Sequence, residues 1–273
     1  MTFKLLKYDL RSTFRSMWMF WVAAPVMAVV TALIAWGYRS IPFIKEYIRF
    51  IGVAAKGVTG TVFTIVMVIM MALTVVVIIQ RFYKGLFAEE GYLSNTLPAK
   101  PWQLITSKGI AALVTVIISS ITAILAIIII GGWNSVTEMW QFVVEVLKSF
   151  TVDWRYVVIA LEIAVIGIFS IMKTIYQLYA SMSIGQLADK HRVLISVIAF
   201  IGLGMIMGGL VFGGIAGFSN LVNGMMIRDW YNTAGEFGTI EILALAIFLL
   251  TILQVAIFHI ITERIISKKL NLL

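Results

Sequence analysis

Residues 81–108, RFYKGLFAEEGYLSNTLPAKPWQLITSK, form the longest polar interruption between two strongly apolar segments of the chain. Gly91 lowers the helix propensity of this stretch, and Pro98 cannot lie inside an unbroken helix because it lacks the backbone N–H that a helix needs. Pro101 suits the first turn of a new helix. The stretch therefore predicts a helix, a tight turn and a second helix that begins near Pro101.

The segments around this stretch are too apolar for a soluble protein. The chain has 273 residues, of which 61% are hydrophobic and 12% are charged, and its mean hydropathy is +1.02. Soluble domains are about a quarter charged, and about 20 apolar residues suffice to cross a bilayer as a helix. We therefore expect an all-α polytopic membrane protein, with a single transmembrane domain over residues 1–273. Its six expected spans are residues 17–37, 58–79, 109–130, 156–180, 193–217 and 240–261.

Charge and cysteine content narrow the function classes. The net charge is +8, which in so apolar a chain indicates contact with anionic lipid, and we expect no nucleic-acid partner. The chain has no cysteine, so disulfides, thiolate metal sites and cysteine nucleophiles are excluded. The first apolar stretch is too long for a cleavable signal and is expected to anchor the chain.

Basic residues predict the orientation in the membrane. Six spans place both termini on one side, and most basic residues lie in the N-terminal segment, the second and fourth loops and the C-terminal tail. The positive-inside rule then predicts cytoplasmic termini, although the outer loop at residues 39–57 is also basic. Residues 133–154 have a helical pattern that fits an interfacial helix on the outer face, and residues 218–239 are expected to form an outer loop.

Residues 2–16 precede the first span and are patterned as an amphipathic helix. Basic side chains fall on one helical face and apolar side chains on another, as in a helix that lies on an anionic membrane surface. The two sets are Lys4, Lys7, Arg11 and Arg15, and Phe3, Leu6, Leu10, Phe14 and Met17. Flanking positive charge that only sets the orientation explains the same residues without a helix. A similar pattern at residues 41–56 predicts a second surface helix.

The loop at residues 81–108 also carries a resemblance to a known family. An acidic residue, then Gly91-Tyr92-Leu93, then Thr96-Leu97-Pro98 before a second basic helix, is similar to the first cytoplasmic loop of permeases from ATP-binding-cassette exporters of the second type. In that family the loop forms a coupling helix that docks on a separate ATPase. The resemblance implies a coupling role for Glu89, Glu90, Gly91, Tyr92, Leu93, Leu97 and Pro98. The alternative is an ordinary solvated loop between two spans.

The resemblance implies a permease subunit, not an enzyme, in a bacterial plasma membrane. ATP and Mg²⁺ would bind the partner ATPase, with no cofactor in this chain, and a second permease subunit, the same or related, would complete the translocation path. Cargo would move outward and would be a peptide, a lipid or an amphipathic drug. The chain itself lacks a phosphate-binding loop, because Val58 stands where the closest match at residues 52–59 needs lysine.

Small residues in the fifth span recur at a spacing that permits close helix packing. Gly204 and Gly208 are four residues apart, as are Gly209 and Gly213, and Gly213 and Gly217. Such spacing lets helix backbones approach closely, and the resemblance implies that this span helps form the contact between two permease halves. The alternative is the general abundance of glycine in membrane spans.

Two ionisable residues lie within the fourth span. A charged side chain at the bilayer centre costs about 2.5–3.5 kcal/mol on insertion scales, so such residues commonly face a cavity or another helix. Glu162 and Lys173 are eleven residues apart, about 16 Å along a helix, and cannot pair directly. Both are candidates for the transport path; the alternative is that they extend toward the two membrane surfaces.

Nothing in the sequence supports a catalytic or metal site. The two histidines, His191 and His259, share no helix and show no metal-ligand spacing with a carboxylate cluster. We expect structural roles for both. A secondary carrier or a non-transporting membrane anchor is the rival function; a carrier is expected to show sequence repeats or several intramembrane ionisable groups. An intramembrane enzyme ranks third.

Overall fold

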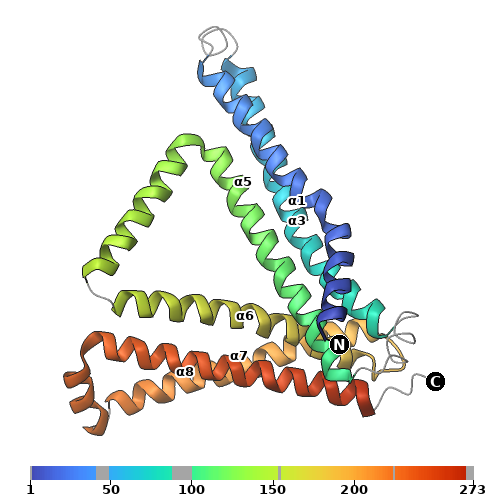
Figure 1. The fold of residues 1–273 in the computed structure, drawn as a ribbon, viewed down its shortest axis with the longest axis vertical. Helices are drawn as coiled ribbons and strands as arrows, with labels where there is room; N and C mark the ends of the chain where they lie inside the picture. Colours follow the sequence, from blue (N-terminus) through green and yellow to red (C-terminus); the bar gives the residue numbers. More distant parts are fainter. Residues whose placement is uncertain (1, 41–48, 88–99, 153–154, 224, 269–273) are drawn as a thin grey trace. The chain divides into compact units, whose positions relative to one another are not determined.

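The computed structural model describes residues 2–40, 49–87, 100–152, 155–223 and 225–268. Within these ranges nearly every residue is helical and no strand occurs, which confirms the all-α prediction. The helices, labelled in Figure 1, are α1 (Thr2–Ser40), α3 (Arg49–Leu86), α5 (Pro101–Val152), α6 (Arg155–Gly185), α7 (Arg192–Asn223) and α8 (Met225–Lys268).

Each of these helices contains a segment that is long and apolar enough to cross a membrane. The six segments are Phe3–Gly37, Gly57–Leu86, Pro101–Gly132, Arg155–Gly185, Arg192–Gly214 and Glu241–Ser267. Each overlaps one expected span, so the multi-pass membrane architecture is confirmed. A bilayer imposes this result because backbone N–H and C=O groups find no water there and must bond within the segment.

The helices extend further than the sequence predicts. Residues 2–16 are helical, but they continue into the first span without interruption. Residues 49–56 are likewise continuous with the second span, while residues 41–48 lie outside the described ranges. Residues 218–239, expected to form an outer loop, are helical in their described part, since α7 runs to Asn223 and α8 begins at Met225. No proline occurs in this segment, so nothing forbids helical hydrogen bonding through it.

Helix α5 is two helices joined at one glycine. Gly132 has φ 66° and ψ −152°, a backbone conformation that is essentially restricted to glycine. The helix resumes after Gly132 and continues to Val152, which confirms a helix in the predicted interfacial segment. The sharp bend in α5 is visible in Figure 1. Exposed side chains of this second helix include Trp140 and Phe142, which suits a helix at the membrane surface.

The chain divides into two compact units, and α3 and α5 contribute to both. One unit contains residues 3–81 and 110–147, hence α1 with the greater part of α3 and α5. Its core joins Ala24, Met70 and Ala123, with Trp21 packed against them. Alanine at these positions allows the helix backbones to approach closely. The other unit contains residues 82–109 and 148–273, in which α6, α7 and α8 pack against one another (Figure 1).

A directed chain of hydrogen bonds crosses the first of these units. The Thr74 hydroxyl donates to the carbonyl oxygen of Met70 (2.8 Å), so its oxygen is left to accept from Ser119 Oγ (3.0 Å). Trp21 Nε1 donates to Ser119 Oγ at 2.9 Å. Ser119 and Thr74 are both buried, so the chain joins α1, α5 and α3 with every hydroxyl proton used.

Candidate functional site

The loop between α3 and α5 is the candidate site, and the structure describes its two flanks. The predicted coupling residues lie outside the described ranges: Glu89, Glu90, Gly91, Tyr92, Leu93, Leu97 and Pro98. On one side α3 ends at Leu86, where Phe87 N–H donates to the carbonyl of Tyr83 (2.8 Å). On the other side α5 begins at Pro101, which confirms the helix start predicted from proline at a first turn.

The start of α5 is capped by a reciprocal pair of hydrogen bonds. Gln103 N–H donates to the carbonyl oxygen of Lys100 (2.9 Å), and Lys100 N–H donates to Gln103 Oε1 (3.2 Å). A glutamine side chain three residues into a helix commonly returns to the cap residue in this way. The cap fixes the point at which α5 begins.

Tyr179 of α6 contacts both flanks of the loop, one by ring stacking and the other by a hydrogen bond. The ring of Phe82, at the end of α3, stacks on Tyr179 with centroids 3.8 Å apart and planes 9° apart. The Tyr179 hydroxyl donates to the carbonyl oxygen of Lys108 in α5 (3.1 Å). Phe82 is fully buried and Tyr179 is 1% exposed. One side chain of α6 therefore contacts the helix before the loop and the helix after it.

A second contact joins the start of α5 to α6 and α8. Gly109 lies directly beneath Tyr176, since a Cβ atom there would be 2.6 Å from the Tyr176 hydroxyl. The Tyr176 ring is 5.4 Å from the ring of His259 on α8. Thr106 Oγ1 is 3.3 Å from His259 Nε2, and its hydroxyl proton goes to the carbonyl of Trp102 (2.7 Å). Thr106 and His259 thus form a polar contact between the start of α5 and α8.

These contacts make the loop flanks part of the best-buried region of their unit. Leu86, Leu104 and Ile105 are 4% exposed or less. From α8, Phe258 and Thr262 are fully buried. Large rigid side chains at this density transmit displacement, because close-packed interiors have low compressibility.

No family model, curated protein or solved structure matches this chain.

The predicted packing glycines of α7 fall into two groups. At Gly204 a Cβ atom would lie 3.0 Å from Gln177 Nε2 on α6, and that amide donates to the carbonyl oxygen of Phe200 (2.9 Å). Gly204 thus provides space for a contact between α6 and α7. The other four, Gly208, Gly209, Gly213 and Gly217, have no atom of the described chain within 4 Å of such a Cβ. A Cβ atom at these four positions would therefore meet open space within the described residues.

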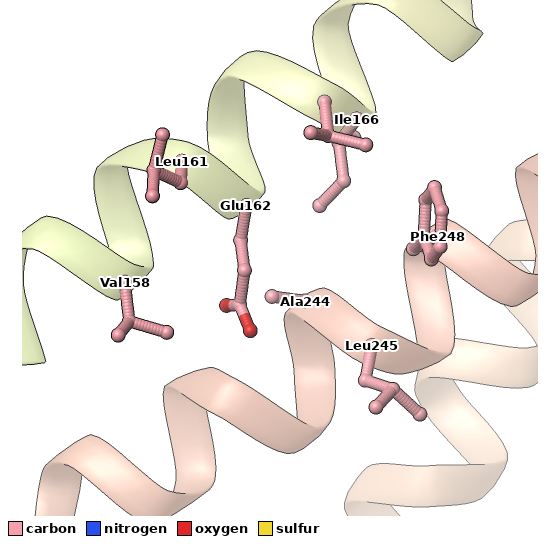
Figure 2. Close-up of a pocket in the computed structure, with 8 residues that line it drawn as sticks. Val158, Leu161, Glu162, Ile166, Ala244, Leu245 and Phe248 are labelled. Carbon is pink, nitrogen blue, oxygen red and sulfur yellow. The ribbon is translucent and has the colours of Figure 1, made fainter.

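Glu162 and Lys173 lie on α6, as predicted, in different surroundings. Glu162 lines a pocket between α6 and α8 (Figure 2). Its Oε2 atom is buried and accepts no hydrogen bond from the described residues. Lys173 is half-buried. The structure does not bring the two together.

Neither histidine belongs to a metal site among the residues that the structure describes, where no group of three potential acidic, histidine or cysteine ligands occurs. His191 occupies the turn between α6 and α7 with φ 57°, a left-handed conformation that suits a tight turn. His259 joins α5 to α8 as described above.

Sequence reasoning missed the side chains that hold the loop. Phe82, Tyr176 and Tyr179 are typical residues of an apolar helix, and only the three-residue spacing of the two tyrosines marks a shared face. Arg81 has a further role that its position in the sequence does not reveal. Its guanidinium donates to the carbonyl oxygen of Ser12 (2.7 Å) and to Ser16 Oγ (2.8 Å), which ties α3 to α1.

Proposed function

We propose that this chain is the permease subunit of an ATP-driven exporter and that the loop at residues 81–108 couples it to a separate cytoplasmic ATPase. ATP and Mg²⁺ bind that partner. The termini and the loop lie on the cytoplasmic side of a bacterial plasma membrane, as the distribution of basic residues favours.

One observation carries the proposal beyond the loop's sequence. Residues 82–109 form a compact unit with residues 148–273, apart from most of α3 and α5. Phe82 and Lys108, on opposite flanks of the loop, both contact Tyr179 of α6. A coupling element needs such a rigid connection, because displacement imposed by a partner must reach other spans. An ordinary connecting loop has no such requirement.

A second permease subunit completes the proposed assembly. The face of α7 with Gly208, Gly209, Gly213 and Gly217 has no intrachain neighbour within contact distance of an added Cβ. Small residues at four-residue spacing allow close approach of another helix. This face is the proposed contact between the two subunits.

The test is the loss of coupling on truncation of the loop's apolar side chains. Burying an aromatic anchor at an interface commonly contributes about 2 kcal/mol or more, whereas a peripheral charge contributes less. Tyr92→Ala should therefore reduce copurification of the ATPase, or stimulation of its hydrolysis by cargo, more severely than Glu89→Ala. Trp140→Ala is the control, because Trp140 is a 65% exposed aromatic outside the loop.

Two results would contradict the proposal. In the first, Tyr92→Ala and Leu93→Ala retain the ATPase and transport as the unaltered protein does. In the second, no ATPase copurifies from mild detergent, which would favour a nucleotide-independent carrier or a membrane anchor.

A further inference from the structure

A crevice between α6 and α8 has a volume of about 360 Å³, and its α6 residues precede Tyr176 and Tyr179. Small-molecule pockets commonly have volumes of about 300–1,000 Å³, so the crevice suits a small ligand. Its walls are apolar except for one carboxyl group, that of Glu162. Figure 2 shows this carboxylate pointing from α6 into the space beside Ala244 and Leu245 of α8.

The carboxylate of Glu162 is short of partners. Oε2 is buried and has no hydrogen-bond donor in the described part of the chain. On α6 the nearest basic residues are Arg155 and Lys173, about 10 Å and 16 Å away along the helix axis. A buried carboxylate oxygen without a donor is costly, so a ligand that supplies one is favoured.

Helix α8 adds a second negative charge near the crevice. Glu241 precedes Ala244 by three residues and Leu245 by four, so it lies on the same face of α8. Glu241 is half-buried. With carboxylates on both helices and no basic side chain among the lining residues, the crevice favours a cation.

The apolar end of the crevice is preformed. Phe248 lines it, and its ring meets Phe169 of α6 edge-on with centroids 5.2 Å apart. Ile166 and Leu245 complete an apolar wall (Figure 2). An acyl chain would fill this space but would leave Glu162 without a donor.

We propose that the crevice binds an apolar molecule with one protonated amine, its ammonium group on Glu162 and its hydrocarbon part against Phe248. If the crevice is the cargo site, the assignment rests on the proposed function, and the cargo of the exporter is then an amphipathic amine. As a binding site it requires neither the ATPase nor transport, so a binding measurement tests it separately.

The experiment compares three probes with one skeleton: 4-phenylbutylamine, 4-phenylbutanol and 4-phenylbutanoate. Equilibrium dialysis at pH 7.4 against the protein in phosphatidylcholine nanodiscs, corrected with empty nanodiscs, gives the affinities. The amine should bind saturably, at one per chain and at least about tenfold more tightly than the alcohol, because a hydrogen bond between charged groups is stronger than a neutral one. The carboxylate should not bind saturably.

Variants identify the site. Glu162→Gln should reduce the preference for amine over alcohol to about one, while Glu162→Asp retains it. Ala244→Phe should reduce binding of both probes by filling the crevice. Glu138→Gln, at an exposed carboxylate on the second helix of α5, should change neither affinity.

Circular dichroism and size-exclusion chromatography establish that each variant is folded. If Glu162→Gln does not fold, the probe affinities of Ala244→Phe and Glu138→Gln are compared instead. Weaker binding in Ala244→Phe alone would support the crevice as the binding site. Equal affinity for the amine and the alcohol, or an amine preference that survives in Glu162→Gln, would overturn the assignment and indicate a crevice filled by lipid chains. Binding without ATPase copurification would support the site while contradicting the proposed function.

Discussion

At the scale of single residues, hydrogen bonds between spans depend on which atom holds each proton. In the chain from Trp21 through Ser119 to Thr74, each hydroxyl donates once and accepts once. Removing the middle residue leaves the Trp21 N–H without its partner in an apolar core. The cost is moderate, because interhelical hydrogen bonds in membranes contribute about 0.6 kcal/mol on average and up to about 1.7 kcal/mol.

We therefore expect an interaction free energy of about 1 kcal/mol between the side chains of Trp21 and Ser119. A double-mutant cycle of Trp21→Phe and Ser119→Ala, with unfolding followed in mixed micelles, measures it. Ser119→Ala with Phe212→Leu serves as the control pair, because Phe212 is 76% exposed on α7. Strict additivity of Trp21→Phe and Ser119→Ala would mean that the hydrogen bond contributes nothing to stability.

At the scale of elements, two helices owe their form to particular glycines. Gly132 divides α5 with a backbone conformation that an alanine could adopt only at a cost of about 1–3 kcal/mol. Gly204 of α7 leaves room for the Gln177 amide. Gly132 therefore determines the path of α5, and Gly204 determines the contact between α6 and α7.

Gly132→Ala should straighten α5 or lower its stability. The chain has no cysteine, so spin labels can be attached at Leu125→Cys and Trp140→Cys, both at exposed positions. In a straight helix these positions are about 22 Å apart along the axis, and the bend shortens that distance. A longer interlabel distance or a lower melting temperature in Gly132→Ala is expected. An unchanged distance and melting temperature would show that the bend does not require glycine.

Gly204→Ala should be less stable than Gly208→Ala by about 1 kcal/mol, the usual contribution of one hydrogen bond. Both substitutions change helix propensity equally, so the difference isolates the displaced contact between Gln177 and Phe200. Unfolding of the monomer in detergent measures it. Equal stabilities would mean that Gln177 retains its hydrogen bond beside the added methyl group.

At the scale of the whole molecule, orientation follows from the distribution of charge between loops. A membrane-impermeant thiol reagent applied to intact cells should label Ser135→Cys and Asn220→Cys but not Ser94→Cys, if the termini are cytoplasmic. Because the chain lacks cysteine, each site is labelled without background. Labelling of Ser94→Cys would invert the orientation and would place the loop at residues 81–108 out of reach of a cytoplasmic ATPase.

The sequence by itself determined that the chain is helical and that its described part contains six segments long and apolar enough to cross a membrane. Long apolar runs must be helical in a bilayer, where backbone groups bond within their own segment, and the six apolar helices follow. Pro101 marked the start of α5 correctly because its missing N–H and fixed φ are local properties. The helical backbone in the described part of residues 218–239 was not predicted, because polar residues and glycine permit a helix as well as a loop.

Only the tertiary structure decided which faces of the helices meet. Helical periodicity shows that Tyr176 and Tyr179 share a face, but not that Phe82 and Gly109 lie against it. It shows that Glu162 is inside a span, but not that α8 forms a crevice beside it. Of the five glycines predicted to pack, four have no packing atom of the described chain within 4 Å of an added Cβ, although their spacing resembles that of Gly204. Helix formation depends on bonds between residues four apart, whereas the choice of packing partner depends on the shapes of side chains far apart in the sequence.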